Sequence, residues 1–394
     1  MTANRRRVLI ALMGAQVLAG LAHGVTYSMG ALLSAEMAGA AWGGAASTVT
    51  TVGAGLWAVP LATLVEKRGR RASLSTGLAL GSLGALSALA GAQTNLFAFV
   101  LIGFFFLGAA VAMNLQARFA AADVAGEDNQ GRFISLVVWS TTVGAVAGPN
   151  LFAPTEKLGE ALGLAPFSGA YLVCFGVQWL AVVLLQVMIR PEVHPTRTRA
   201  TGRVPLGRYP SAAAAIAVNA VSHFAMVALM SMTAVHLHGH GASITLIGVT
   251  ISFHVLGMYG FAPVFGWLAD ATRPSLAIHL GLGLSLLSAS MMIAGAQTEA
   301  VVVVALLLLG VGWSSTLVGS STLITNVTAE QDRPTVQGRS DFVMNLTGAT
   351  GGVIAGPVVS MWGIEWMGVV VVAAIAVVVA GTRVYGARAA APKK

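Results

Sequence analysis

The sequence has few charged residues and a single cysteine. Asp, Glu, Lys and Arg make up only 9% of its 394 residues, against about 25% in an ordinary soluble domain. Together with a mean hydropathy of +0.80, this scarcity predicts a membrane protein that crosses the bilayer several times. Because Cys174 is alone, no intramolecular disulfide can form, and we expect a buried structural thiol.

Apolar segments of the length needed to span a bilayer recur along the whole sequence. We expect the first to be retained and not cleaved as a signal peptide, because it is long and an even series of spans follows it. The twelve predicted spans are residues 8–33, 42–65, 72–92, 96–118, 133–155, 168–189, 210–235, 243–268, 274–296, 300–325, 340–361 and 364–386.

The basic residues are confined to one side of these spans. Of the 22 Lys and Arg residues, all but Lys157 lie before the first span, at or after the end of the last span, or in or next to even-numbered loops. Positively charged loops mark the cytoplasmic side, so both termini are expected in the cytoplasm. The net charge of +8 therefore sets the topology, and no nucleic-acid partner is expected.

The chain divides into two halves that resemble each other. A polar linker, 190–209, separates a six-helix bundle at 1–189 from a second bundle at 210–394. The sequences LATLVEKRGRR (61–71) and GWLADATRP (266–274) occupy equivalent loops, and GAVAGP (144–149) matches GGVIAGP (351–357). One transporter architecture is built from such parallel six-helix repeats.

These loops resemble the signature of the major facilitator superfamily, roughly G-x-x-x-D-R/K-x-G-R-R/K. The second copy keeps Gly266 and Asp270 but lacks the basic tail. The resemblance implies an all-α membrane protein of 12 transmembrane helices in two pseudo-symmetric six-helix bundles. The first copy carries Ala62, Glu66, Lys67, Gly69, Arg70 and Arg71.

The acidic residues of these loops suggest a cytoplasmic gate. A carboxylate at the end of one helix can face the positive N-terminus of another helix. We expect Glu66 to face the start of span eleven and Asp270 to face the start of span five, with Arg70 beside them. The alternative is that these charges only fix the topology.

Thioethers and imidazoles recur at helical spacing in spans seven and eight. In HFAMVALMSM (223–232), His223, Met226 and Met230 share one face, and His254 and Met258 share a face of the next span. Consecutive helices joined by a short loop are antiparallel neighbours, so the two stripes can converge.

This set of ligands favours one kind of ion. Thioether sulfur with imidazole suits Cu(I), whereas Mg²⁺ and Ca²⁺ require oxygen ligands and structural zinc prefers thiolate. The alternative is packing, because methionine readily fills irregular cores.

The combination resembles the CcoA-like copper importers of the same superfamily, whose signature is Met-x-x-x-Met in span seven and His-x-x-x-Met in span eight. Met226, Met230, His254 and Met258 match it position by position. The resemblance implies a monomer that imports copper, as substrate and not as cofactor, across the bacterial inner membrane. It implies supply of a cuproenzyme such as cbb3-type cytochrome c oxidase, with copper chaperones as partners.

Other residues are candidates for secondary roles. His23 and His223 could add metal ligands or pack between helices, and Asp341 could couple transport to protons. Uniport driven by the membrane potential is also sufficient, since one inward charge gains about 2.3 kcal/mol per 100 mV. The predicted periplasmic loop HLHGHG (236–241) carries His236, His238 and His240, which could capture metal.

Three other functions compete with copper import. A transporter of riboflavin or a drug on the same fold would use aromatic faces such as Trp57 and Trp313. A membrane enzyme is not expected, because the sequence has no nucleophile, acid pair or redox motif. A copper sensor would need a soluble output domain, and the longest loop has about 20 residues.

Overall fold

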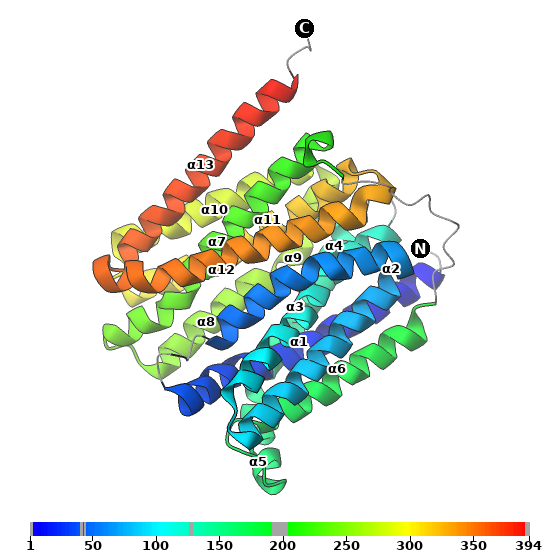
Figure 1. Ribbon diagram of the computed structural model, residues 1–394. Helices are drawn as coiled ribbons and strands as arrows, with labels where there is room; N and C mark the ends of the chain where they lie inside the picture. Colours follow the sequence, from blue (N-terminus) through cyan, green and yellow to red (C-terminus); the bar gives the residue numbers. More distant parts are fainter. Residues whose placement is uncertain (1–2, 40–41, 43–44, 126–128, 191–203, 391–394) are drawn as a thin grey trace. The chain divides into compact units, whose positions relative to one another are not determined.

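The computed structural model describes residues 3–39, 42, 45–125, 129–190 and 204–390. Every regular element in these ranges is a helix, and no strand occurs among them (Figure 1). This confirms the all-α fold predicted from the sequence. Most of the predicted linker, 191–203, falls outside the described residues.

The first half contains one helix that is longer than the sequence predicted. Spans two and three are merged because the intervening loop is helical except at Gly69, where φ is 83° and ψ is 173°. Glycine adopts positive φ without steric cost, so the chain changes direction there. The helices are α1 (Ala3–Ala38), α2 (Ala45–Thr94), α3 (Phe97–Val124), α4 (Gln130–Asn150), α5 (Phe152–Ala161) and α6 (Gly169–Met188).

In the second half, predicted span eight is interrupted. Phe261 separates α8 from α9, and a proline near the start of α9 suits a helix N-terminus. The helices are η3 (Leu206–Arg208), α7 (Pro210–Gly239), α8 (Ile244–Gly260), α9 (Ala262–Ala271), α10 (Pro274–Gly295), α11 (Glu299–Val327), η4 (Glu330–Asp332), α12 (Arg333–Trp362) and α13 (Ile364–Ala390).

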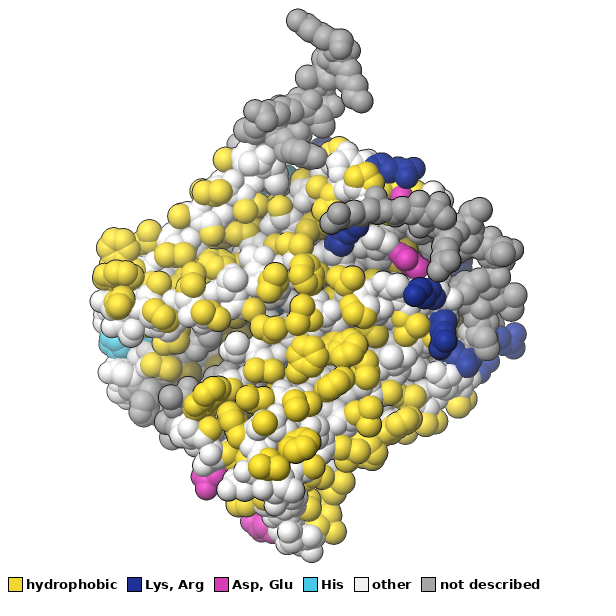
Figure 2. Space-filling view, in the orientation of Figure 1, with side chains coloured by type: hydrophobic (Ala, Val, Ile, Leu, Met, Phe, Trp, Pro, Cys, Tyr) yellow, Lys and Arg dark blue, Asp and Glu magenta, His cyan; other side chains and the backbone are white. Residues whose placement is uncertain are grey.

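The described helices account for the predicted number of spans. Ten stretches are long and apolar enough to cross a membrane. Dividing α2 at Gly69 and adding α4 gives twelve within the described ranges. In Figure 2, hydrophobic side chains cover much of the drawn surface, and few charged side chains interrupt them.

Contacts divide the chain into two compact units. The first unit contains residues 1–125 and 137–197, and the second contains 126–136 and 198–394. The segment 126–136 groups with the second unit, because the first turns of α4 pack on α9. A Cβ atom on Gly131 would lie 2.6 Å from the carbonyl oxygen of Gly266. The backbones of α4 and α9 can therefore come this close only because both positions are glycine.

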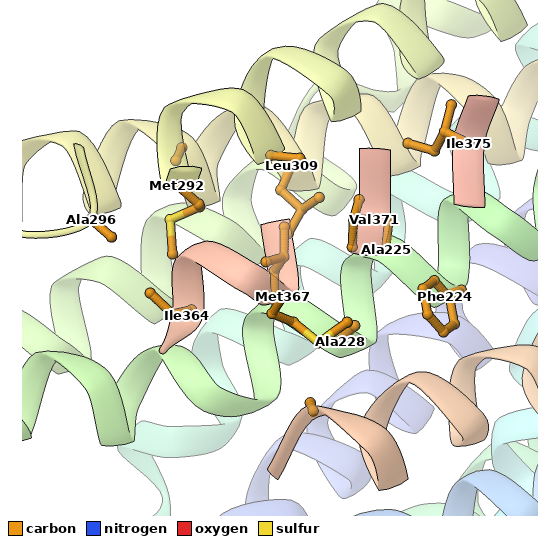
Figure 3. Packing of buried hydrophobic residues seen from close by; sticks show 14 of the residues in the cluster. Phe224, Ala225, Ala228, Met292, Ala296, Leu309, Ile364, Met367, Val371 and Ile375 are labelled. Atoms are coloured by element: carbon orange, nitrogen blue, oxygen red, sulfur yellow. The ribbon is translucent and has the colours of Figure 1, made fainter. Parts of the chain in front are cut away.

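The second unit has a large apolar core between α7, α10, α11 and α13 (Figure 3). Buried residues of this core include Ala228, Met292, Leu309 and Met367. Because lipid offers helices no hydrophobic incentive to associate, such close packing is what holds membrane helices together. The core fixes the positions of α7 and α11, the two helices on which the candidate site depends.

Candidate transport site

Helix α7 has two different faces. One face contributes Val221, Ala225, Ala228 and Leu229 to the apolar core. At helical spacing, the other side of α7 carries the polar and sulfur-containing residues Asn219, Ser222, His223, Met226 and Met230. The predicted stripe of ligands is therefore turned away from that core.

This arrangement separates the methionines of the second unit into two groups. Among the described residues, the apolar core includes Met292 and Met367, with Met232 and Met291 packed against it, but neither Met226 nor Met230. Met226 is buried and Met230 is half-buried. Packing in this core therefore accounts for some methionines of the unit and not for the predicted ligands.

His254 in α8 is fully buried and has one ring nitrogen committed to the backbone. Its Nδ1 lies 2.8 Å from the carbonyl oxygen of Leu306 in α11. Because a carbonyl oxygen can only accept a hydrogen bond, Nδ1 carries the ring hydrogen and Nε2 carries the lone pair. Within the described part of the chain, Nε2 has no hydrogen-bond partner. Metal-binding histidines are typically oriented by such a carbonyl contact.

Met258, one turn after His254, lies against the same helix. A Cβ atom on Gly310 of α11 would meet the carbonyl oxygen of His254 and would come within 3.0 Å of the Met258 nitrogen. Met258 is 8% exposed. The missing side chain at Gly310 thus allows the His-x-x-x-Met turn to pack directly on α11.

Trp313 of α11 connects α7 with α8. Its indole N–H donates to Nδ1 of His223 over 2.9 Å. Its ring centroid is 5.9 Å from that of Tyr259 in α8, nearly edge to face. This indole therefore marks one common level of the two antiparallel helices, which also contact each other.

The four predicted ligands occur close to that level. At about 1.5 Å of rise per residue, Met226 lies about 4.5 Å and Met230 about 10 Å beyond His223. Helix α8 runs antiparallel to α7, so the corresponding direction leads from Tyr259 back toward the start of α8. Along it, Met258 directly follows Tyr259, and His254 lies about 7.5 Å beyond Tyr259. By this rise, the two sulfur-and-imidazole stripes cover overlapping lengths of α7 and α8.

His223 itself is engaged in helix packing. Its Nδ1 accepts from Trp313, so in the neutral ring the hydrogen is on Nε2 and no lone pair is left for a metal. Its ring also fills the space above Gly348 of α12. Packing, the alternative considered from the sequence, therefore describes His223 better than a ligand role.

The histidines after the stripe form a pair. The Nε2 of His236 is 2.7 Å from the carbonyl oxygen of Ala296, and Nδ1 of His240 is 2.8 Å from the carbonyl oxygen of His236. Their ring centroids are 4.2 Å apart. Each ring thus keeps one nitrogen with a lone pair. The side chain of His238 lies outside the described residues.

Comparisons with known proteins agree with this arrangement of helices. The family model for the Major Facilitator Superfamily matches residues 212–394. The uncharacterized MFS-type transporter YdeG of Bacillus subtilis (strain 168) is 33% identical over 357 residues, 87% of this chain and 83% of the relative. The chain belongs to the major facilitator superfamily.

A second relative and one solved structure are also similar to this chain. The riboflavin transporter RfnT of Brucella anthropi is 30% identical over 386 residues, 95% of each chain. The crystal structure of the human organic anion transporter MFSD10 (TETRAN) superposes with a TM-score of 0.77 at 14% identity, covering 96% of this chain and 99% of that chain. The second similarity concerns the fold alone.

The superfamily loop of the second half makes the contact that the sequence predicted. The Asp270 Oδ1 accepts from the Gly131 N–H over 2.7 Å, and Oδ2 accepts from the Arg132 N–H over 2.8 Å. Asp270 therefore binds the N-terminus of α4, where the helix dipole favours a carboxylate. Its function as a gate stays a prediction.

The loop of the first half shows a partner that sequence reasoning missed. Arg70 is largely buried and forms an ion pair with Asp123 at the end of α3, at 2.7 Å. Only the opposite charge of Asp123 could have indicated it. Glu66 is exposed in α2, and its predicted contact with span eleven stays a prediction.

Asp341 and His23 are two further candidates. Asp341 is completely buried in α12, two turns before Gly348, with Gln337 and Asn345 also buried on that helix. His23 is exposed on α1 of the first unit. No group of three or more His, Cys, Asp and Glu side chains that could hold a metal occurs among the described residues.

Proposed function

We propose that this transporter imports copper, as Cu(I), across the bacterial inner membrane. Met226, Met230, His254 and Met258 would bind the ion during transport. The observation that carries the proposal is the buried His254, one turn from Met258 in α8. Its Nε2 lone pair has no hydrogen-bond partner among the residues that the structure describes. A buried ionisable residue in a membrane helix is costly and is a functional candidate by default.

The chemistry of the four side chains suits a transported ion. All four are neutral when they bind, and thioethers with imidazole select soft Cu(I) over hard cations. No thiolate is available, so the ion is held without the tight binding that would prevent its release. The single cysteine, Cys174, is buried in the first unit.

The remaining predicted residues supply a route and a driving force. The His236–His240 pair, at the end of α7 predicted to face the periplasm, would be the first to contact copper. The two six-helix bundles would rock around the site by alternating access, with Glu66, Arg70 and Asp270 closing the cytoplasmic side. Asp341 would couple transport to protons. The imported copper would supply assembly of enzymes such as cbb3-type cytochrome c oxidase.

The proposal is tested by measuring copper in cells that lack their own importer. Met226→Leu/Met230→Leu conserves side-chain volume and removes only the sulfur atoms. Met291→Leu/Met292→Leu makes the same change at the apolar core of α10 and is the matched control. At equal protein levels, we expect the intact chain and the control to raise cell-associated copper and the first variant to leave it at background. Equal copper in the two variants would refute the assignment.

A second candidate substrate is an aromatic organic molecule such as riboflavin. Besides the similarity to RfnT, the first unit contains a buried Trp57 indole N–H that has no hydrogen-bond partner among the described residues. The rings of Phe105 and Phe106 lie 5.9 and 5.6 Å from Trp57. Uptake of labelled riboflavin by the same cells, lost on Trp57→Phe and kept in the methionine variant, would favour this substrate.

A further inference from the structure

The first unit contains a pocket in which Arg70 is the one lining residue that the transport proposals also use. It has a volume of about 370 Å³ and lies where α1 and the second part of α2 begin and where α3 and α6 end. This volume is within the range of small-molecule sites, about 300–1,000 Å³. Its lining combines arginines with an apolar surface.

The arginines leave the pocket with unbalanced positive charge. Arg5, Arg70 and Arg190 line it, together with the carboxylate of Asp123. Arg70 is paired with Asp123. Arg5 and Arg190 are exposed, and within the described residues neither has an ion-pair or hydrogen-bond partner. Two cations are therefore available at the mouth of the pocket.

The rest of the lining is apolar and lies deeper in the helices. Val8 and Leu12 follow Arg5 at one-turn intervals along α1, and Leu74 follows Arg70 by one turn in α2. Arg5 lies in the first turn of α1, and Arg190 follows the end of α6. The basic mouth is thus at the level of lipid headgroups, and the apolar part extends toward the hydrocarbon core.

We propose that this pocket binds the phosphate headgroup of an anionic phospholipid. Arg5 and Arg190 would contact the phosphate, and Val8, Leu12 and Leu74 would cover the first carbons of an acyl chain. Basic pockets between membrane helices on the cytoplasmic side are suited to such headgroups. Asp123 faces the same space, but its charge is balanced by Arg70. The proposal is independent of the transported substrate.

The test uses the full chain purified in detergent and exposed to phosphatidylglycerol, with bound lipid measured by native mass spectrometry. Arg5→Ala/Arg190→Ala removes the two unpaired cations from the pocket. Arg6→Ala/Arg68→Ala is the matched control, because both residues are exposed at the same end of the unit and do not line the pocket. We expect the pocket variant to retain roughly tenfold less phosphatidylglycerol and the control to retain as much as the intact chain.

Two competitors distinguish the source of the phosphate. Phosphatidylcholine, which is zwitterionic, is expected to displace little phosphatidylglycerol, and inorganic phosphate is expected to displace almost none because it lacks the acyl chain. Equal loss of lipid in both arginine variants would mean a general surface-charge effect and would overturn the proposal. Full displacement by inorganic phosphate at equal concentration would also overturn it, in favour of a free anion.

Discussion

Two regions of the second unit both contain buried methionine, and they differ in what surrounds it. In the apolar core, Met292 and Met367 contact aliphatic side chains of α7, α11 and α13 (Figure 3). On the other side of α7, Met226 shares its face with Asn219 and His223, and Trp313 bridges that face to α8. Methionine therefore packs against aliphatic side chains in one region and is a candidate ligand in the other.

The difference shows what a thioether can do in each setting. In an apolar core, the flexible methionine side chain fills irregular gaps, and replacing it with leucine changes the free energy of unfolding only slightly. Beside a buried imidazole with an available lone pair, the sulfur can act as a soft donor. Substitutions that conserve volume should therefore be harmless in the core and damaging at the site.

Removal of the imidazole should have the largest effect. His254→Ala eliminates the one nitrogen ligand, and we expect copper uptake to fall by roughly 10- to 100-fold, at least as much as when groups that orient a metal ligand are lost. Copper uptake per molecule of protein in the membrane is the measurement. Unchanged uptake would remove the distinction between the two regions.

A change that leaves every ligand in place should have the next largest effect. In Gly310→Ala, the new Cβ would meet the His254 carbonyl oxygen and push α8 away from α11. We expect copper uptake to fall severalfold although all four ligands remain. Gly283→Ala in α10 is the control, because a Cβ there meets nothing within 4 Å. Equal uptake in the two variants would show that this packing does not position the site.

The core should respond in stability and not in transport. Met292→Ala leaves a cavity, which should cost about 2–5 kcal/mol in the free energy of unfolding. Thermal unfolding in detergent gives the loss of stability, and copper uptake normalised to folded protein should stay within about twofold of the intact chain. A selective loss of uptake without loss of stability would place Met292 in the transport site.

The smallest effect on stability and on copper uptake is expected for a substitution at Met232, two residues after the predicted ligand Met230. Met232 packs against the apolar core, so Met232→Leu should change stability by less than about 1.5 kcal/mol and leave copper uptake unchanged. The same two measurements, made in parallel with Met230→Leu, compare the two faces of α7 directly. A loss of uptake in Met232→Leu alone would reverse the assignment of the faces.

Several structural features could be predicted from particular residues. Apolar length and the positions of Lys and Arg predicted the spans, and the paired loops predicted the contact between Asp270 and the start of α4. Helical spacing separated Met232 from Met226 and Met230. The continuation of α2 through the loop at Gly69 was not predicted, because a helix can continue through a short polar loop when neighbouring helices support it. The interruption at Phe261 was not predicted either, because it falls within an apolar segment long enough to span the membrane.

The sequence by itself determined the membrane-spanning helices and the face on which each candidate ligand lies, because hydrophobicity and helical periodicity are local properties. The tertiary structure decided which nitrogen of each histidine is available. His223 loses its lone pair to Trp313, whereas His254 keeps the Nε2 lone pair because the Leu306 carbonyl oxygen binds Nδ1. Both partners are on α11, more than 50 residues away in the chain, so only packing of the three helices could bring them to these rings.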